Sequence, residues 1–122
     1  MIIKCKTCGL PLTPSLKKLQ AKELLNEEDN RNFIPRGYFV FSDGEFFTNS
    51  EGKIIINKED LINSKDHSDS SRLYGCCGLD GMNGMNKTCN NNHEIGTEKS
   101  DCWMPHCVIF ENEHIEIVEE EV

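Results

Sequence analysis

The chain of 122 residues falls within the usual size range of one domain. Hydrophobic residues make up only 37% of it, so burial alone offers limited stabilisation and a bound metal ion would help. With 21 acidic and 13 basic residues the formal charge is −8, a balance that repels phosphate backbones. These values predict a single domain over residues 1–122 that does not bind nucleic acid directly.

The apolar residues are too dispersed for a membrane-spanning segment. No stretch approaches the ~18 consecutive apolar residues that such a segment needs. Met1 to Lys4 lead into Cys5 without the apolar region of a signal peptide. We therefore expect a cytoplasmic protein that has no contact with a membrane.

Seven cysteines are many for a cytoplasmic protein. In a reducing compartment they are expected to be metal ligands or buried thiols rather than disulfides, and their odd number also argues against a complete disulfide set. They are Cys5, Cys8, Cys76, Cys77, Cys89, Cys102 and Cys107.

The first half of the chain is expected to form a helix and then a small sheet. Ser15 can cap a helix over residues 16–25, whose leucines recur at roughly helical spacing. Aromatic and β-branched residues at 38–42 and 45–49 flank Asp43-Gly44, which predicts a β-hairpin. Residues 53–56 would add a third antiparallel strand.

The second half is expected to depend on a metal ion for its order. Asn57 can cap a short helix, and residues 64–72 are polar enough to form a loop. Residues 75–101 are rich in glycine and asparagine, so burial can hardly order them. Strands at 107–110 and 114–118 are expected to pair as a hairpin before an acidic tail at 119–122.

Together these elements predict an α+β fold. It would have a small antiparallel sheet, one or two short helices, and a zinc-ribbon-like region stapled by metal.

Cys5-x-x-Cys8-Gly9 has the spacing of a zinc knuckle. Two thiolates three positions apart can grip one tetrahedral ion, and the glycine permits the tight turn behind them. A redox dithiol would be expected at a helix N-terminus after a strand, whereas here Gly9 and two prolines follow. The pair is therefore interpreted as half of a structural zinc site.

The other half must come from later in the chain, since structural zinc takes four nitrogen or sulfur ligands. Cys77-Gly78 repeats the end of a knuckle, and Cys89 follows a glycine-rich loop that can fold back. Cys76 can substitute for Cys77, and His93 is the rival for the fourth position because it completes a C-x3-H spacing. The predicted ligands are Cys5, Cys8, Cys77 and Cys89.

The segment from Asp101 to Cys107 offers further candidates. Cys102, His106 and Cys107 could form a second metal site, or a cysteine nucleophile with a histidine base. The structural interpretation is favoured, in which Cys102 and Trp103 are buried against the core. Four protein ligands would leave the zinc no open position for water, so hydrolysis is not expected.

Several of these motifs together resemble an uncharacterised family of small bacterial zinc-ribbon-like proteins. The resemblance runs from about Cys5 to His106 and implies a bacterial, cytoplasmic, zinc-binding protein without an assigned activity. It is carried by CxxCG at 5–9, PRG at 35–37, GCCGLDG at 75–81, Asn86, Cys89, GTE at 96–98 and DCW at 101–103.

The function expected from these features is that of a non-catalytic, zinc-stabilised protein-interaction module. Its acidic character favours a basic protein partner, such as the toxin neutralised by an immunity or antitoxin-like protein. The alternative is a thiol-based redox or hydrolytic enzyme that uses Cys77 or Cys102 with His106. Zinc storage or delivery is a third possibility and would require a labile site.

Overall fold

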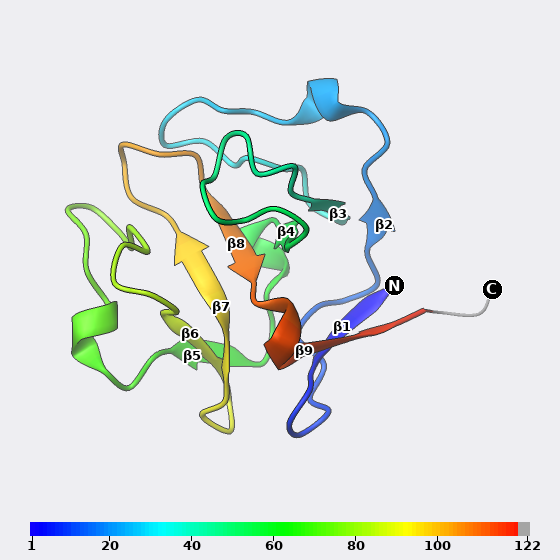
Figure 1. Ribbon diagram of the computed structural model, residues 1–122, viewed down its shortest axis with the longest axis vertical. Helices are drawn as coiled ribbons and strands as arrows, with labels where there is room; N and C mark the ends of the chain where they lie inside the picture. The colour runs from blue at the N-terminus through cyan, green and yellow to red at the C-terminus, as the bar shows by residue number, and fades with distance from the viewer. Residues whose placement is uncertain (120–122) are drawn as a thin grey trace.

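The computed structural model describes residues 1–119 and is mostly β-structure, with a seven-stranded mixed sheet and a two-stranded sheet (Figure 1). The order of the large sheet is β2-β3-β4-β8-β7-β6-β5, and β1 pairs with β9 in the small one. The strands are β1 (Ile2–Cys5), β2 (Lys17–Lys18), β3 (Tyr38–Phe41), β4 (Ile54–Ile56), β5 (Ser64–Asp66), β6 (Lys87–Cys89), β7 (Glu94–Lys99), β8 (Cys107–Phe110) and β9 (Ile115–Val118).

The large sheet is antiparallel except at one edge, where the short β2 runs parallel to β3. Its central strands are buried on both faces, as the alternation along β4 illustrates. Ile54 and Ile56 belong to one hydrophobic cluster and Ile55 to another. The molecule therefore has a core on each side of this sheet.

The first core lies between the two sheets. β1 and β9 contribute residues to it, and Cys5 stands opposite Ile115 in their antiparallel register. Because these strands come from opposite ends of the described chain, the small sheet ties the two ends together. The members of the first core are Ile3, Cys5, Leu12, Leu16, Phe39, Ile54, Ile56, Cys89, Ile95, Val108, Phe110 and Ile115.

The second core covers the opposite face of the large sheet. Loop residues supply half of it, among them Phe33 and Phe47, whose ring centroids lie 5.0 Å apart in an edge-to-face arrangement. Its members are Leu19, Phe33, Ile34, Val40, Phe47, Ile55, Cys107 and Ile109.

The expected helices are not α-helices, and the described residues contain only single turns of 3₁₀ helix. The prediction of a helix over 16–25 is wrong because its leucines do not share one face. Leu16 packs in the first core, Leu19 packs in the second, and Leu24 is exposed. The four turns are η1 (Lys22–Leu24), η2 (Lys58–Asp60), η3 (Ser70–Arg72) and η4 (Asn112–His114).

The predicted cap at Asn57 is confirmed. Its side-chain oxygen accepts a hydrogen bond from the backbone nitrogen of Glu59 at 2.8 Å, and its amide donates to the carbonyl of Ile34 at 2.9 Å. The element that follows is nevertheless a single 3₁₀ turn, so the α component of the predicted fold class is corrected.

The predicted hairpin between 38–42 and 45–49 is also wrong. β3 pairs instead with β4, and residues 42–53 form a long connection between them. Phe46 and Phe47 leave the sheet plane to pack on Phe33, with centroid distances of 6.1 and 5.0 Å. Burial of Phe47 in the second core outweighs the extension of the ladder.

The two C-terminal strands form as predicted but do not pair with each other. Both edges of β8 are already occupied, by β4 on one side and β7 on the other. η4 therefore turns the chain away, and β9 pairs with β1. Of the predicted acidic tail, Glu119 is described and exposed, and the remainder lies outside the described residues.

Over residues 1–119, no helix has the length and apolar character that crossing a membrane would require.

Candidate metal centre

Four nitrogen and sulfur donors converge from two distant parts of the chain, and they could hold a metal ion. Their ligand atoms all lie within 4.8 Å of one another. Cys8 Sγ is 3.9 Å from Cys89 Sγ, and His93 Nδ1 is 3.7 Å from Cys5 Sγ and 3.3 Å from Cys89 Sγ. The group consists of Cys5, Cys8, Cys89 and His93.

The first two donors are placed by a tight turn at the end of β1. The backbone nitrogen of Gly9 donates to the carbonyl of Cys5 at 2.7 Å, and the Cys5 nitrogen donates to the carbonyl of Leu10 at 2.9 Å. Gly9 has φ +76°, a left-handed conformation that favours glycine. This is the knuckle that the CxxCG spacing predicts.

The other two donors are placed by the turn that joins β6 to β7. Cys89 donates from its backbone nitrogen to the carbonyl of His93 at 2.8 Å, and Asn92 donates to the carbonyl of Cys89 at 3.0 Å. Asn92 has φ 68°, which asparagine tolerates better than most residues. The asparagine run is thus a tight turn that brings His93 back beside Cys89.

Asn91 supports the sulfur atoms from within this turn. Its side-chain amide lies 3.4 Å from Cys8 Sγ, and its backbone nitrogen donates to Cys89 Sγ at 3.3 Å. The side-chain hydrogen bond from Asn91, followed by one from the backbone at Leu10, lowers the pKa of the Cys8 thiol to about 6. Burial raises the pKa of the Cys5 thiol. A cation would overcome that penalty, because it favours the thiolate form of both groups.

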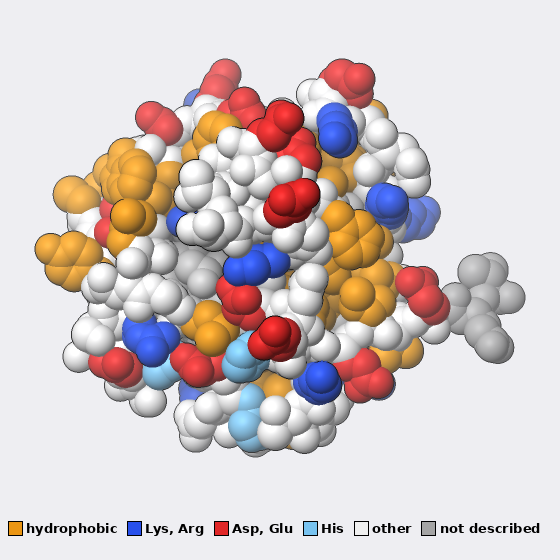
Figure 2. Space-filling model, viewed as in Figure 1, with side chains coloured by type: hydrophobic (Ala, Val, Ile, Leu, Met, Phe, Trp, Pro, Cys, Tyr) orange, Lys and Arg blue, Asp and Glu red, His pale blue; other side chains and the backbone are white. Residues whose placement is uncertain are grey.

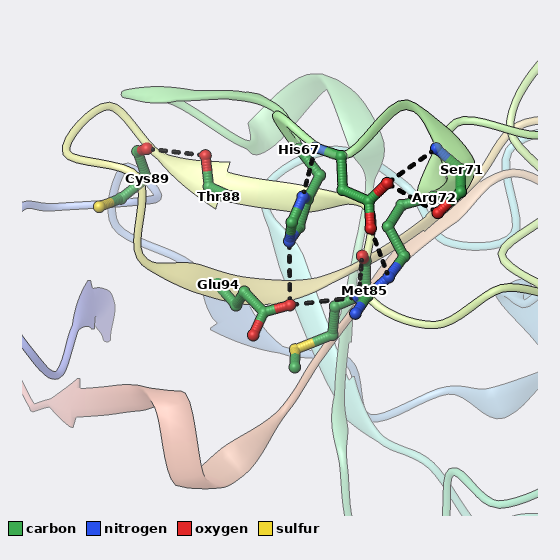
Figure 3. Close-up of polar contacts among 8 residues, drawn as sticks. His67, Ser71, Arg72, Met85, Thr88, Cys89 and Glu94 are labelled. Carbon is green, nitrogen blue, oxygen red and sulfur yellow. Dashed lines mark hydrogen bonds and ion pairs between the residues drawn. The ribbon is translucent and has the colours of Figure 1, made fainter.

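A polar network fixes the start of β7, the strand that begins directly after His93 (Figure 3). The carboxylate of Glu94, which follows His93, lies 3.0 Å from His67 Nε2 and accepts from Arg72 Nη1 at 3.2 Å. The same nitrogen of Arg72 donates to the carbonyl of Met85 at 2.9 Å. The turn that carries Cys89 and His93 is therefore anchored to the loop after β5.

Three of the four predicted ligands come together here, namely Cys5, Cys8 and Cys89. Cys77 does not join them, and the fourth donor of the group is His93. The C-x3-H spacing from Cys89 is the sequence signal for His93, whereas the signal for Cys77 is only that Cys77-Gly78 repeats the end of a knuckle. The structure gives Cys77 a different environment.

Cys77 lies in a second group, with Cys102 and Asp101. The side chain of Asp101 is buried and accepts four N–H bonds. Oδ1 accepts from the backbone of Cys77 at 2.9 Å and of Cys102 at 2.7 Å. Oδ2 accepts from the backbone of Cys76 at 2.9 Å and from Trp103 Nε1 at 2.9 Å. These bonds hold the pKa of Asp101 well below its usual range, with those from Cys77 and Cys76 contributing most.

The two glycines of GCCG permit this close approach. A Cβ at Gly75 would lie 1.7 Å from the carbonyl oxygen of Gly78, and one at Gly78 would lie 2.3 Å from that of Ser100. The segments GCCG and DCW, which are far apart in sequence, are thus one structural unit. Hydrogen bonding to Cys77, followed by burial, raises the pKa of the Cys102 thiol to about 12.

The remaining sequence candidates, His106 and Cys107, belong to neither group. His106 Nδ1 lies 2.8 Å from Lys58 Nζ and its Nε2 lies 3.0 Å from the carbonyl of Asp101, so both ring nitrogens are engaged. Cys107 is buried in β8 within the second core. The predicted burial of Trp103 is wrong: its side chain is 53% exposed because only its Nε1 edge is drawn toward Asp101.

Trp103 borders a cavity of about 370 Å³ that the sequence did not indicate. Figure 2 shows hydrophobic side chains gathered on the left of the view, where Figure 1 has the loop from β7 to β8. The lining residues are Asp29, Phe46, Phe47, Thr48, Met82, Lys99, Trp103, Met104 and Pro105.

No family model, no curated protein and no solved structure matches this chain. The resemblance to zinc-ribbon-like proteins therefore stays a prediction. The fold and the site define a mostly-β protein with a three-cysteine, one-histidine group that could hold a metal ion.

Proposed function

We propose that this protein is a non-catalytic, zinc-stabilised module for binding another protein. The observation that carries the proposal is the convergence of Cys5, Cys8, Cys89 and His93 from two separate turns. Two such turns facing each other are also the arrangement that the term zinc-ribbon-like describes.

The donor set and its spacing fit zinc. Zinc prefers sulfur and imidazole nitrogen in tetrahedral geometry, with bonds of about 2.3 Å to sulfur and about 2.0–2.1 Å to nitrogen. Those bonds require ligand separations of about 3.8 Å between sulfurs and about 3.6 Å between sulfur and nitrogen. The separation of Cys8 Sγ from Cys89 Sγ is 3.9 Å, and those of Nδ1 from Cys5 and Cys89 Sγ are 3.7 and 3.3 Å. Little rearrangement is needed to bind the ion.

A site with four protein ligands is closed, which favours a structural role over a catalytic one. With all four donors bound, no coordination position remains for an activated water. The ligands belong to β1 with its knuckle and to the β6–β7 turn, so the ion would join the small sheet to the large one.

Metal analysis of the purified protein tests this proposal. We expect one zinc ion per chain that survives dialysis against a weak chelator and is lost in Cys8→Ser and His93→Ala. Cys77→Ser is the matched control and should retain it. A tightly bound ion that is lost in Cys77→Ser but retained in His93→Ala would contradict this ligand set.

For the partner, we propose a basic protein that binds as a toxin binds its immunity or antitoxin-like protein. The formal charge of −8 favours such an encounter. The cavity beside Trp103 supplies the apolar contact that charge alone does not. Phe46, Met82 and Trp103 are exposed around it, and aromatic residues and methionine are enriched at protein interfaces.

Affinity capture at two salt concentrations tests the partner. We expect a basic protein to be retained at low salt and released as salt screens the charges. Met82→Ser should weaken its capture, whereas Ile117→Ser, a control on β9 that is also exposed, should not. Failure to capture any basic protein from the native host at low salt would count against this role without affecting the zinc site.

A further inference from the structure

Two cysteine sulfurs outside the candidate metal centre come together where the GCCG and DCW segments meet. Cys77 Sγ and Cys102 Sγ lie within 4.8 Å of each other and of a carboxylate oxygen of Asp101. Cys77 and Cys102 are far apart in sequence, so a specific turn is needed to bring their sulfurs together.

Asp101 provides that turn and is not itself available as a ligand. A carboxylate has about four acceptor positions, and the four N–H bonds to Asp101 occupy them. Its role is that of an outer-shell group, which fixes the main chain that carries the sulfurs and places a negative charge beside them.

The sulfurs themselves do not hold this unit together. The backbone nitrogens of Cys76, Cys77 and Cys102 make the bonds to Asp101. Cys76 and Cys77 are exposed and Cys102 is half-buried, whereas Cys107 is buried in the core. The thiols of Cys77 and Cys102 are thus positioned by the fold and accessible from solvent, without being required for packing.

We propose that Cys77 and Cys102 form a second metal site, which takes a soft thiophilic ion, Cu(I) or Zn(II), through their two thiolates. Thiolate sulfur selects these ions over harder ones. Sulfur atoms that share one ion of this size lie about 3.8 Å apart, and Cys77 Sγ and Cys102 Sγ lie within 4.8 Å of each other. Two protein ligands at a solvent-accessible place leave further coordination positions open, so this ion would exchange readily, unlike the one at the closed site.

Metal titration of the intact, reduced protein tests the second site. The protein is first loaded with one equivalent of zinc, so that the closed site is filled and the fold is kept. Cu(I) is then added in one arm and Cd(II), as a probe for Zn(II), in the other. Thiolate-to-metal charge-transfer absorption reports binding. We expect a second equivalent to bind in at least one arm, and the stronger arm identifies the preferred ion.

Two variants assign the second equivalent to its ligands. The double variant Cys77→Ser with Cys102→Ser should lose it while retaining the first zinc ion. The matched control Cys107→Ala removes a cysteine outside both groups and should keep both equivalents. The proposal is overturned if the wild type binds no second equivalent in either arm, or if the double variant still binds it. If Cys8→Ser loses only the first zinc ion, this result concerns the closed site and leaves the second site unaffected.

Discussion

Asn91 touches two sulfurs of the candidate metal centre without being one of its four donors. Its amide lies 3.4 Å from Cys8 Sγ and its backbone nitrogen 3.3 Å from Cys89 Sγ. Removing an outer-shell partner of this kind weakens metal binding by about 10–100-fold. We expect Asn91→Ala to lower zinc affinity by about tenfold, because only the side-chain bond is lost. Competition with a chromophoric chelator at neutral pH measures the change.

The neighbouring asparagine provides the control for this prediction. Asn90 is exposed, and its backbone nitrogen donates to the carbonyl of Asn63 at 2.9 Å, a bond that alanine keeps. Asn90→Ala should therefore bind zinc as the wild type does. Equal affinities of the Asn90 and Asn91 variants would show that the amide bond to Cys8 does not contribute.

The buried thiol of Cys107 should make the protein less stable at alkaline pH. Burial raises the pKa of its thiol to about 12, whereas a thiol in an unfolded chain titrates near ~8.5. Above that pH the unfolded state loses a proton that the folded state keeps. The contribution of Cys107 is thus fully present below the unfolded pKa and declines as pH rises toward the folded pKa, by on the order of 1 kcal/mol for each pH unit.

Cys107→Ala tests this pH dependence. The variant should be less stable than the wild type at about pH 8, by on the order of 1 kcal/mol, because a core side chain is shortened. Its free energy of unfolding, measured by denaturant titration, should approach that of the wild type at about pH 10, since alanine has no proton to lose. A difference that stays constant between these pH values would contradict the prediction.

At the scale of the element, Gly78 of the GCCG loop is needed for close packing rather than for an unusual backbone angle. A Cβ at Gly78 would lie 2.3 Å from the carbonyl oxygen of Ser100, which is backbone and cannot easily move. We expect Gly78→Ala to destabilise the protein by about 2 kcal/mol or more and to separate the loop from Asp101. Thermal unfolding measures the loss.

Gly52→Ala is the control for Gly78→Ala, because it introduces backbone strain without a steric conflict. Gly52 has φ +79°, and no atom lies within 4 Å of the place that a Cβ would take. Alanine there should therefore cost only the left-handed conformation, about 1 kcal/mol. If Gly52→Ala and Gly78→Ala are equally destabilised, the close approach of Gly78 to Ser100 is not the cause of the lost stability.

Local chemistry allowed several elements of this chain to be predicted. The alternating or apolar runs at Tyr38–Phe41, Ile54–Ile56 and Cys107–Phe110 are strands, and Asn57 caps the turn after the second of them. The pairing of these strands was not predictable, because it depends on which partners arrive from far along the chain. β1 and β9 meet across almost the whole described length, and no local pattern specifies that contact.

The site was predictable to the extent that ligand spacing is local. Cys5 with Cys8, and Cys89 with His93, each form a pair within one turn, and both spacings can be recognised in the sequence. Spacing left open whether Cys76 replaces Cys77 and whether His93 replaces Cys89. In the structure Cys89 and His93 both join Cys5 and Cys8, whereas Asp101 binds the backbone of Cys76 and Cys77 and holds them at a different place.

At the scale of the whole molecule, the two groups of cysteines divide the glycine- and asparagine-rich segment into two parts. Composition alone suggests that one ion clamps all of residues 75–101. In the structure the GCCG loop is bound to Asp101, whereas the four donors of the candidate metal centre lie on the β6–β7 turn and on the knuckle after β1. The two parts should therefore respond differently when the metal is removed.

Chelation followed by hydrogen exchange tests this division. Without the ion, residues 2–12, 87–95 and 115–118 should lose protection, because the small sheet and the β6–β7 turn are no longer joined through their ligands. The GCCG loop should stay protected, since its backbone bonds to Asp101 do not involve the ion, and β3 with β4 should also persist within the two cores. Mass spectrometry of peptides from the exchanged protein locates the change, and zinc added back should reverse it. A uniform loss of protection over all these segments would instead mean that the ion is required for the whole fold.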